Sequence, residues 1–512
     1  MKKYLKTQQS KRALICNSLF KLFVILWIFG FFVFNHSVAF AGKLDNYGGF
    51  TDLKGKKTGF FHTQKIDGRW WLVTPEGHGF YGIGLSHPVT SFSQGVVTFS
   101  YNGDQEAWLR DGIKKMRDLG YNCVWSGPYS QERIRLGFVD RELAERVYRE
   151  EKIPHAIHVP LIKHGVELKP GESHVDVFSD EYAQFVQKQV ARYVTPNKDN
   201  PWIMGYYYGF GSFARAGKWI NQTLMRESGS AGREHLILTL KKRYNSDIKK
   251  LNSVYKKNYR SWNDLQKKGG ITYPSAYLQY SKNKVRAEDQ RALIAEIVEQ
   301  VHKLGKAEIR KVDSNHMILG CYVKSKTYSL DLWKRIAPYI DALAPQHFSE
   351  SHKIKPVVKS TGLPAFLSDH ENGNVYSEFL LSSGKAFGPV PDHLDRRVRY
   401  HLSARRLAGD PDFIGVSFCA LLFDNSHWVQ PYDRGQPGFY TIDNEPRTKT
   451  IETAKESNAY IYRNVRRAAL DEKELKALDD DYHKTIFHYR AIAEKRRMFL
   501  EKNKSASERA IP

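Results

Sequence analysis

The sequence predicts an α/β protein built around a single (β/α)8 barrel. Short apolar runs alternate with helical patterns from about residue 79 onward, and eight such runs can be counted. This alternation is typical of βα units and a parallel sheet, and eight units close into a barrel. No Gly-x-Gly-x-x-Gly follows the first run, which disfavours an open dinucleotide-binding sheet. We expect three additions to the barrel: a small N-terminal β element, a helical insertion after the fourth strand, and a charged helical C-terminal tail.

Residues 1–41 predict a secretory signal peptide. Lysines and arginines such as Lys2, Lys3 and Arg12 come first, a short apolar run spans 22–34, and small residues surround Ala41. The apolar run is shorter than the roughly 20 residues that span a bilayer. We therefore expect cleavage after Ala41 and an exported protein, periplasmic or secreted, with no stable membrane span.

The chain is strongly basic, with a formal net charge of +24. A balance of this size attracts polyanions. Nucleic acid is not the expected partner, because an exported protein seldom meets it and no compact Lys/Arg tract is interleaved with aromatic residues. An acidic polysaccharide or oligosaccharide is the expected substrate. Cys123, Cys321 and Cys419 each lie in an apolar run, so we expect buried thiols rather than disulfides or a zinc site, and no metal or cofactor.

The small β element is assigned to residues 42–78. Asp67-Gly68 predicts a two-residue hairpin turn, and residues 75–77 predict a second turn before the first barrel strand. The predicted barrel strands are 79–86, 121–126, 154–160, 202–208, 316–323, 341–346, 364–369 and 413–420. The predicted helices are 105–118, 130–151, 180–196, 286–312, 330–338, 393–407 and 447–467.

The barrel as a whole is assigned to residues 79–469, and two further segments carry helical patterns without a motif. Residues 210–285, rich in Lys, Arg, Tyr and Trp, read as a helical insertion over the C-terminal face. Residues 470–512 are helical and highly charged, and end in a polar tail. The oligomeric state is not indicated.

In barrel enzymes the active site is built at the carboxyl ends of the strands. These positions are rich in aromatic rings, which stack on sugars, and in polar groups that bond sugar hydroxyls. This concentration predicts a carbohydrate site. The expected substrate-binding residues are His87, Asn122, Trp125, Tyr207, Tyr322, Lys324, His347 and Trp428.

Four segments resemble the barrels of β-agarases and related β-galactosidase-type glycoside hydrolases. They are IDGRWWLVTPEGHGFYGIGLSHP, DNPWIMGYYY, GLPAFLSDHENG and the stretch that begins DFIGVSFCALLFDN. The resemblance runs from about residue 58 to 465. It implies a barrel fold and polysaccharide hydrolysis.

The chain departs from the family pattern where the chemistry is carried. In the family a Glu preceded by Asn ends the fourth strand, and the matching positions here hold Gly211 and Phe210. The seventh-strand nucleophile Glu is matched by Asp369, and the eighth-strand Trp by Phe418. Retaining hydrolysis needs two carboxyl groups about 5–5.5 Å apart, and the sequence shows only the first.

Three hypotheses follow. The protein is a hydrolase that uses Asp369 as nucleophile or base and Glu371, or a residue of another loop, as the acid. Alternatively it is a polysaccharide lyase that cleaves a polyuronate by β-elimination, with Tyr208, His370 and neighbouring Tyr, His and Lys side chains as acids and bases. In the third hypothesis the barrel has lost catalysis and binds a glycan.

Overall fold

The computed structural model divides into two compact units, Met1–Lys43 and Leu44–Pro512. The residues described are 43–88, 94–125, 140–162, 174–210, 213, 215–274, 283–324, 329–346, 351–370, 393–423, 438–441, 443–484 and 498. Within them, no helix is both long and apolar enough to cross a bilayer. The predicted signal peptide lies outside the described residues.

The N-terminal β element is a four-stranded antiparallel sheet in the order β1-β4-β3-β2. Its strands are β1 (Phe50–Lys54), β2 (His62–Ile66), β3 (Arg69–Val73) and β4 (His78–Phe80). The expected hairpin joins β2 to β3, and Asp67 and Gly68 both have positive φ, at 49° and 81°. Positive φ at both central residues is the geometry of a type I′ turn. The turn prediction is confirmed.

The second sheet has seven strands, all parallel, in the order β5-β11-β10-β9-β8-β7-β6. From β6 to β11, strands that are consecutive in the chain pair with each other, as expected for successive βα units. Strand β5 pairs with β11, the last strand in the chain. The strands are β5 (Gly82–His87), β6 (His155–His158), β7 (Ile203–Phe210), β8 (Met317–Lys324), β9 (Pro345–Gln346), β10 (Ala365–His370) and β11 (Phe413–Leu421).

The expected strand at 121–126 is reduced to two isolated parallel bridges. Cys123 pairs with Gly84 of β5, and Val124 pairs with His155 of β6. The two residues therefore lie between the first and last strands of the seven-stranded sheet. The expected strand at 79–86 also divides, since β4 belongs to the antiparallel sheet and β5 to the parallel one.

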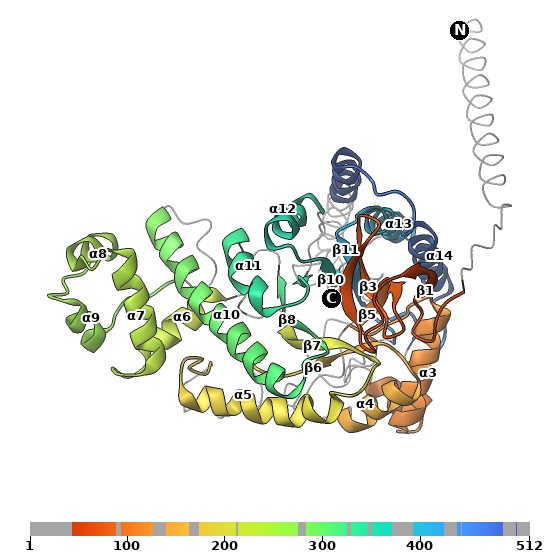
Figure 1. The fold of residues 1–512 in the computed structure, drawn as a ribbon, viewed down its shortest axis with the longest axis horizontal. Coiled ribbons are helices and arrows are strands. Elements are labelled where there is room, and N and C mark those ends of the chain that lie inside the picture. Colours follow the sequence, from red (N-terminus) through yellow and green to blue (C-terminus); the bar gives the residue numbers. More distant parts are fainter. Residues whose placement is uncertain are drawn as a thin grey trace, which may run out of the picture. The chain divides into compact units, whose positions relative to one another are not determined.

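Helices follow the strands along the chain (Figure 1). Many begin after an N-cap residue whose side chain accepts a hydrogen bond from a backbone N–H of the first helical turn. Asp104 accepts in this way from the N–H of Ala107, and Ser179 accepts from the N–H of Tyr182. Helices α2 and α12 have no counterpart among the predicted helices. The helices are α2 (Gln94–Ser100), α3 (Gln105–Asp118), α4 (Arg141–Glu150), α5 (Asp180–Tyr193), α6 (Ala216–Met225), α7 (Ala231–Arg243), α8 (Ile248–Tyr255), α9 (Trp262–Lys268), α10 (Lys284–Val312), α11 (Leu330–Ile336), α12 (Ser351–Thr361), α13 (His393–Gly409) and α14 (Thr448–Asn464).

Two buried clusters lie on the two faces of the parallel strands. The larger joins outward strand residues such as Ile83 and Val416 to the helices. The smaller joins inward residues such as Met204 and Met317 to Phe61, Leu72 and Phe80 of the N-terminal element. Because Met204 and Met317 stand near the beginnings of β7 and β8, the antiparallel sheet packs against the amino ends of the parallel strands.

Arg69 of β3 fixes this sheet to the C-terminal half of the chain. Its buried guanidinium donates to the carbonyl oxygens of Leu407, Ala408 and Asp410, at 3.2, 2.9 and 2.8 Å. Desolvation lowers the pKa of Arg69. The three carbonyls lie at and just beyond the carboxyl end of α13, where a cation is electrostatically favoured.

The segment between β7 and β8 is helical, as expected. Helices α6, α7 and α8 pack on α10, and α7 also contacts α6 and α9. In Figure 1 these helices lie beyond α10 from the parallel strands. In the tail, residues 472–484 are helical, and Leu475 and Tyr482 are buried. An ion pair joins Asp479 of this helix to Arg406 of α13 at 3.3 Å, and both side chains are buried. The first part of the tail is therefore docked.

Candidate active site

A series of stacked rings lies on the inner side of the parallel strands. His158 of β6 stacks on Tyr207 of β7, with centroids 4.9 Å apart, and Tyr207 stacks on Tyr322 of β8 at 4.6 Å. Tyr322 meets Phe366 of β10 edge to face at 5.4 Å. Trp125, which follows the bridged residues, stacks on Phe366 at 4.0 Å. The sequence-predicted residues Trp125, Tyr207 and Tyr322 are thus brought together.

These rings form a buried aromatic layer, called the aromatic floor below, and not an exposed surface on which a sugar could stack. Trp125, Tyr207 and Tyr322 have no exposed surface, and His158 is 4 % exposed. The Tyr322 hydroxyl donates to the Trp125 carbonyl oxygen at 2.6 Å. Burial raises the pKa of both Tyr207 and Tyr322, so both phenols are neutral. Direct stacking of a sugar on these three rings would require them to become exposed.

Glycines of the neighbouring strands make room for the Trp125 indole. A Cβ atom at Gly82 of β5 would lie 2.7 Å from Trp125, and one at Gly415 of β11 would lie 2.9 Å from it. Both glycines have ordinary negative φ, so space rather than backbone conformation requires them. Gly82 therefore leaves room for this ring, and Gly415 leaves room both for the ring and for the Gly82 carbonyl oxygen, which an added Cβ would meet at 2.5 Å.

Buried hydroxyl groups link the other strands on the inner side. Ser86 of β5 and Ser417 of β11 lie 2.9 Å apart, Oγ to Oγ, and Ser86 also donates to the Ser368 carbonyl at 3.3 Å. Ser368 donates to the Ala344 carbonyl at 3.1 Å. These small polar residues satisfy one another and leave the aromatic floor uncharged.

Arg141 is the charged group that the sequence analysis missed. It begins α4, and its guanidinium donates to the His158 carbonyl at 2.8 Å and stacks over Tyr193 at 3.8 Å. Its positive charge opposes the rise in the Tyr207 pKa that burial causes. Nε of Arg141 pairs with Glu145 at 2.5 Å, while the buried Nη1 has no hydrogen-bond partner among the described residues. A cation in the first turn opposes the helix dipole, and this mismatch is the signal by which the sequence could have revealed it.

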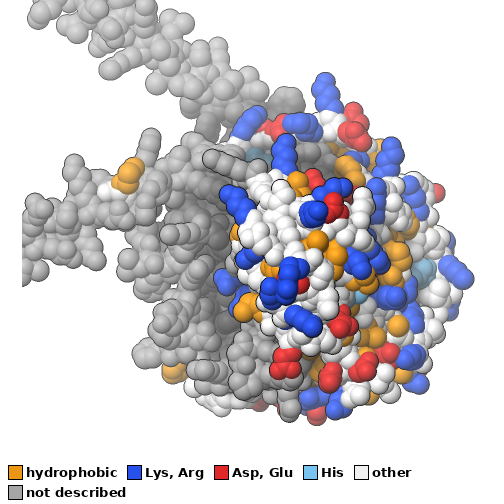
Figure 2. All heavy atoms as spheres, turned by 90° about the vertical axis from the view of Figure 1, so that its left-hand side faces the viewer, with side chains coloured by type: hydrophobic (Ala, Val, Ile, Leu, Met, Phe, Trp, Pro, Cys, Tyr) orange, Lys and Arg blue, Asp and Glu red, His pale blue; other side chains and the backbone are white. Residues whose placement is uncertain are grey.

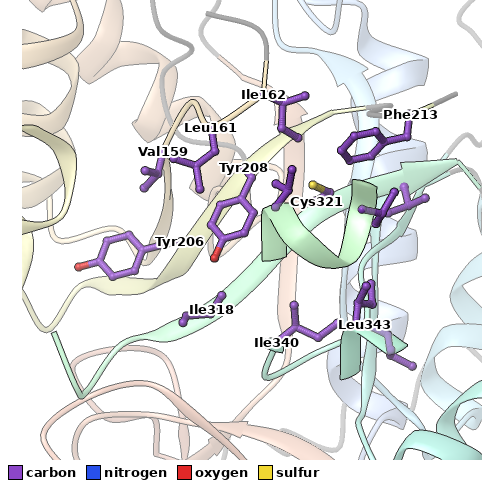
Figure 3. Close-up of a cluster of buried hydrophobic side chains, with 14 of the residues drawn as sticks. Val159, Leu161, Ile162, Tyr206, Tyr208, Phe213, Ile318, Cys321, Ile340 and Leu343 are labelled. Carbon is purple, nitrogen blue, oxygen red and sulfur yellow. The ribbon is translucent and has the colours of Figure 1, made fainter. Parts of the chain in front are cut away.

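Tyr208, which we considered as a catalytic residue, lies on the opposite face of β7 from Tyr207. Figure 3 shows Tyr206 and Tyr208 among apolar side chains that include Leu161, Cys321 and Ile340. The Tyr208 hydroxyl points toward Gly305 of α10, where an added Cβ would meet it at 2.7 Å. Successive residues of a strand alternate between faces, so the structure separates Tyr208 from the stacked rings.

Asn122 is also separated from them, because it precedes the bridged residues rather than following them. Its amide donates to the carbonyl of Tyr81 and the hydroxyl of Tyr462, at 2.9 and 2.8 Å, and accepts from the Ile83 N–H at 2.7 Å. These bonds hold β5 and α14 at the amino end of the strands. Asn122 also lines a 540 Å³ pocket there, with Lys152 and Lys455.

The backbone of β10 carries the two predicted catalytic positions at its end. Asp369 pairs with Gln346 of β9, and His370 pairs with Phe418 of β11. The side chains of Asp369 and His370 lie outside the described residues, as do those of His87 and Lys324. Glu371, His347 and Trp428 lie outside them altogether. The described side chains at these strand ends include no carboxylate.

One group of potential metal ligands occurs among the described residues, in the N-terminal element. Ligand atoms of Asp45, Glu76 and His78 lie within 4.8 Å of one another. Asp45 already accepts from Thr74 and lies 2.8 Å from Nδ1 of His78. The Lys54 ammonium lies 3.1 Å from the other nitrogen of His78. This group is satisfied as a hydrogen-bonded turn, remote from the strand ends.

Comparison with known proteins supports the resemblance. No protein-family model matches the chain. The chain is 22 % identical over 498 residues to β-agarase B of Vibrio sp. (strain JT0107), a match that covers 81 % of this chain and 50 % of that protein. The chain therefore spans about half the length of the curated relative that it matches.

Solved structures share the fold. The agarase AgWH50C matches with a TM-score of 0.64 and 18 % identity, over 83 % of this chain and 68 % of that one. An exo-β-agarase matches with a TM-score of 0.63 and 17 % identity, over 82 % and 67 %. The resemblance to β-agarases predicted from the sequence is confirmed. The matches give no support to the lyase hypothesis.

Proposed function

We propose that this chain is an exported glycoside hydrolase of the β-agarase type that cleaves an acidic polysaccharide. The supporting observation is the match to β-agarase B along 81 % of the chain. The shared fold with AgWH50C supports the same assignment. The formal net charge is +24, and 24 − 6 = +18 without the six Lys and Arg residues of 1–41, which supports an anionic substrate.

The parallel strands, in this proposal, close into the (β/α)8 barrel. Cys123 and Val124 are paired with both outer strands of the seven-stranded sheet, and this supports an eighth strand position. We further propose the boundaries 1–41 for the signal peptide, 42–78 for the β element, 79–469 for the barrel with its insertion at 210–285, and 470–512 for the tail.

For the chemistry, we propose Asp369 as nucleophile or base. It stands in β10 at the register of Gln346, near the carboxyl end of the strand, where barrel enzymes place catalytic groups. Glu371, two residues further on, is proposed as the acid. Around them we place His87, Lys324, His347, His370 and Trp428 as the supporting sugar site, with Tyr207 and Tyr322 as buried rings that pack behind it.

A non-catalytic glycan-binding barrel is the alternative that one observation favours. From Trp202 to Lys218 the sequence contains no carboxylate, so β7 cannot supply the acid that retaining hydrolysis needs. The two functions differ in whether bonds are broken, which an assay decides directly.

The test is incubation of the protein with agar, carrageenan and alginate, followed by reducing-end and ultraviolet measurements. New reducing ends without absorbance of an unsaturated uronate are expected. Reducing ends together with that absorbance would mean elimination and overturn the proposal. Binding without new reducing ends on any of these polymers would favour the non-catalytic barrel.

A further inference from the structure

The helices inserted between β7 and β8 carry a concentrated positive charge. From Lys241 to Lys268 the sequence holds ten Lys or Arg residues and two Asp residues. Nine of the ten cations are exposed. Figure 2 shows Lys and Arg side chains spread over this end of the protein. We call this surface the α7–α9 basic surface, formed by Lys242, Arg243, Lys249, Lys250, Lys256, Lys257, Arg260, Lys267 and Lys268.

Four of these nine cations lie within 4.0 Å of a carboxylate oxygen, among them Lys250, which is 3.9 Å from Asp247. Asp264 is buried and pairs with Lys268 at 3.0 Å, and Asp289 of α10 pairs with Arg243 at 2.8 Å. Asp247 is occupied as the cap of α8, where it accepts from the N–H of Lys249 at 2.9 Å. Five lysines have no carboxylate oxygen within 4.0 Å among the residues that the structure describes, namely Lys242, Lys249, Lys256, Lys257 and Lys267.

Two of these cations oppose the stability of the helix that carries them. Lys249 and Lys250 lie in the first turn of α8, which has no acidic residue. A cation there interacts unfavourably with the helix dipole. The helix dipole therefore does not account for the two lysines.

The backbone beneath the cations is held in one arrangement. Asn252 of α8 donates to the Tyr259 carbonyl at 2.8 Å and accepts from the Tyr259 N–H at 3.0 Å. The Tyr259 hydroxyl donates to the Gly269 carbonyl at 2.5 Å, and the Trp262 indole donates to the Ser246 carbonyl at 2.8 Å. A preorganised surface loses less conformational entropy when it binds.

Hydrogen bonds on the buried side of helices α7–α9 also hold this backbone in place. The Asp289 carboxylate of α10 accepts from the hydroxyls of Tyr244 and Tyr255, each at 2.7 Å, as well as from Arg243. Tyr255 and Tyr273 are hydrogen-bonded to each other at 2.5 Å. The tyrosines of the module are thus turned inward, while its lysines remain outside.

We propose that the α7–α9 basic surface binds an anionic polysaccharide and holds the enzyme on the polymer, apart from the strand ends. Sulfate or carboxylate groups repeated along a glycan suit point cations of this kind. Exposed aromatic rings that stack on bases, as in single-strand nucleic-acid binding, are not found among the described residues of α7–α9. An exposed apolar stripe that would enter a lipid surface is also not found there, since Leu238 is the one large apolar side chain exposed in these helices.

The test compares two triple variants that lose equal charge. One is Lys249→Gln/Lys256→Gln/Lys257→Gln. The matched control is Lys114→Gln/Lys188→Gln/Lys303→Gln, which changes exposed lysines of α3, α5 and α10. The probes are carrageenan, alginate and neutral agarose in affinity electrophoresis at several salt concentrations. All variants carry Asp369→Asn, so that the measurement does not depend on turnover.

The expected result is a loss of about tenfold or more in affinity for carrageenan or alginate in the α7–α9 variant, with a weaker salt dependence. The control should lose less than about threefold. Equal losses in both variants would show a net-charge effect and overturn the inference. Stronger binding of duplex DNA or anionic vesicles than of either glycan, reduced by the same variant, would also overturn it.

The choice of a glycan as the polymer rests on the proposed function. The experiments nevertheless distinguish a failure of the proposed surface from a failure of the proposed hydrolase. Binding that the α7–α9 variant abolishes, without hydrolysis by the unmodified enzyme, would retain the surface and reject the hydrolase. Both triple variants are also made with Asp369 unchanged. If these hydrolyse short soluble oligosaccharides, and the α7–α9 variant binds the polymer as well as the control does, the hydrolase is retained and the surface is rejected.

Discussion

The indole of Trp125 and the phenyl ring of Phe366 lie parallel, with centroids 4.0 Å apart and planes 10° from each other. Trp125 follows the segment bridged to β5 and β6, whereas Phe366 lies in β10, which pairs with β9 and β11. Their contact joins the bridged segment to β10, the strand that ends at Asp369 and His370. Packing at this contact therefore bears directly on the proposed catalytic strand.

Gly82→Ala is expected to destabilise the fold through Trp125. The added Cβ would lie 2.7 Å from the indole, and overpacking of this kind costs about 1–3 kcal/mol. Urea unfolding should show this loss, and the loss should fall by about 1 kcal/mol or more in a Trp125→Leu background. The same cost in both backgrounds would show that the indole is not the obstacle.

Arg69→Met is expected to lower the free energy of unfolding by about 2–4 kcal/mol. The substitution leaves the carbonyls of Leu407, Ala408 and Asp410 without their common donor. Lys65→Met on the exposed side of β2 is the control, and should change stability by about 0.5 kcal/mol or less. Similar losses in both variants would contradict the proposed role of the buried guanidinium.

The protein is expected to lose stability as the pH falls from about 6.5 to 4. Burial lowers the pKa of His155 and of His302 to about 4. An unfolded histidine titrates near 6.5, so the unfolded chain binds more protons in this window and stability rises with pH. The loss approaches about 3 kcal/mol per histidine at pH 4, at about 1.4 kcal/mol per pH unit.

Urea unfolding at pH 7, 5.5 and 4.5 measures this effect. His302 donates from Nδ1 to the Val298 carbonyl at 2.7 Å and accepts at Nε2 from the Cys321 N–H at 3.2 Å. The neutral imidazole is the form that makes both bonds. His302→Gln should flatten the pH dependence between 6.5 and 4, and an unchanged slope in this variant would exclude His302 as a source.

Asp369→Asn is expected to reduce kcat on a confirmed substrate by about 10³-fold or more, since an amide can neither attack nor accept a proton. Asp412→Asn, at the start of β11, is the control and should retain activity within about twofold. Near wild-type activity of Asp369→Asn would remove Asp369 from the mechanism. A loss confined to KM would assign Asp369 to binding.

The sequence predicted the strands well where they are long and bounded by turns. Strands β7, β8, β10 and β11 fall within a few residues of the predicted ranges. Helix α12 was missed because Pro356 interrupts it, and a proline is normally a sign of a helix end. The strand at 121–126 shrank to two bridged residues, which propensity alone does not reveal.

The site residues were harder to predict, for reasons of geometry. In Tyr206-Tyr207-Tyr208 all three side chains are buried. A strand covered on both faces gives a continuous apolar run without alternation. The inward face of β7, which holds Tyr207, could therefore not be told from the face that packs on α10. Asn122 was misplaced because the extended segment begins after it.

The pairing of β5 with β11 has a consequence for biosynthesis. Ser86 and Ser417, whose hydroxyls meet between these strands, are 331 residues apart. During synthesis on the ribosome, β5 cannot pair with β11 until nearly the whole protein has been made. Its unpaired edge is open to other strands during that time, so we expect nascent or truncated chains that end before β11 to depend on chaperones and to aggregate without them.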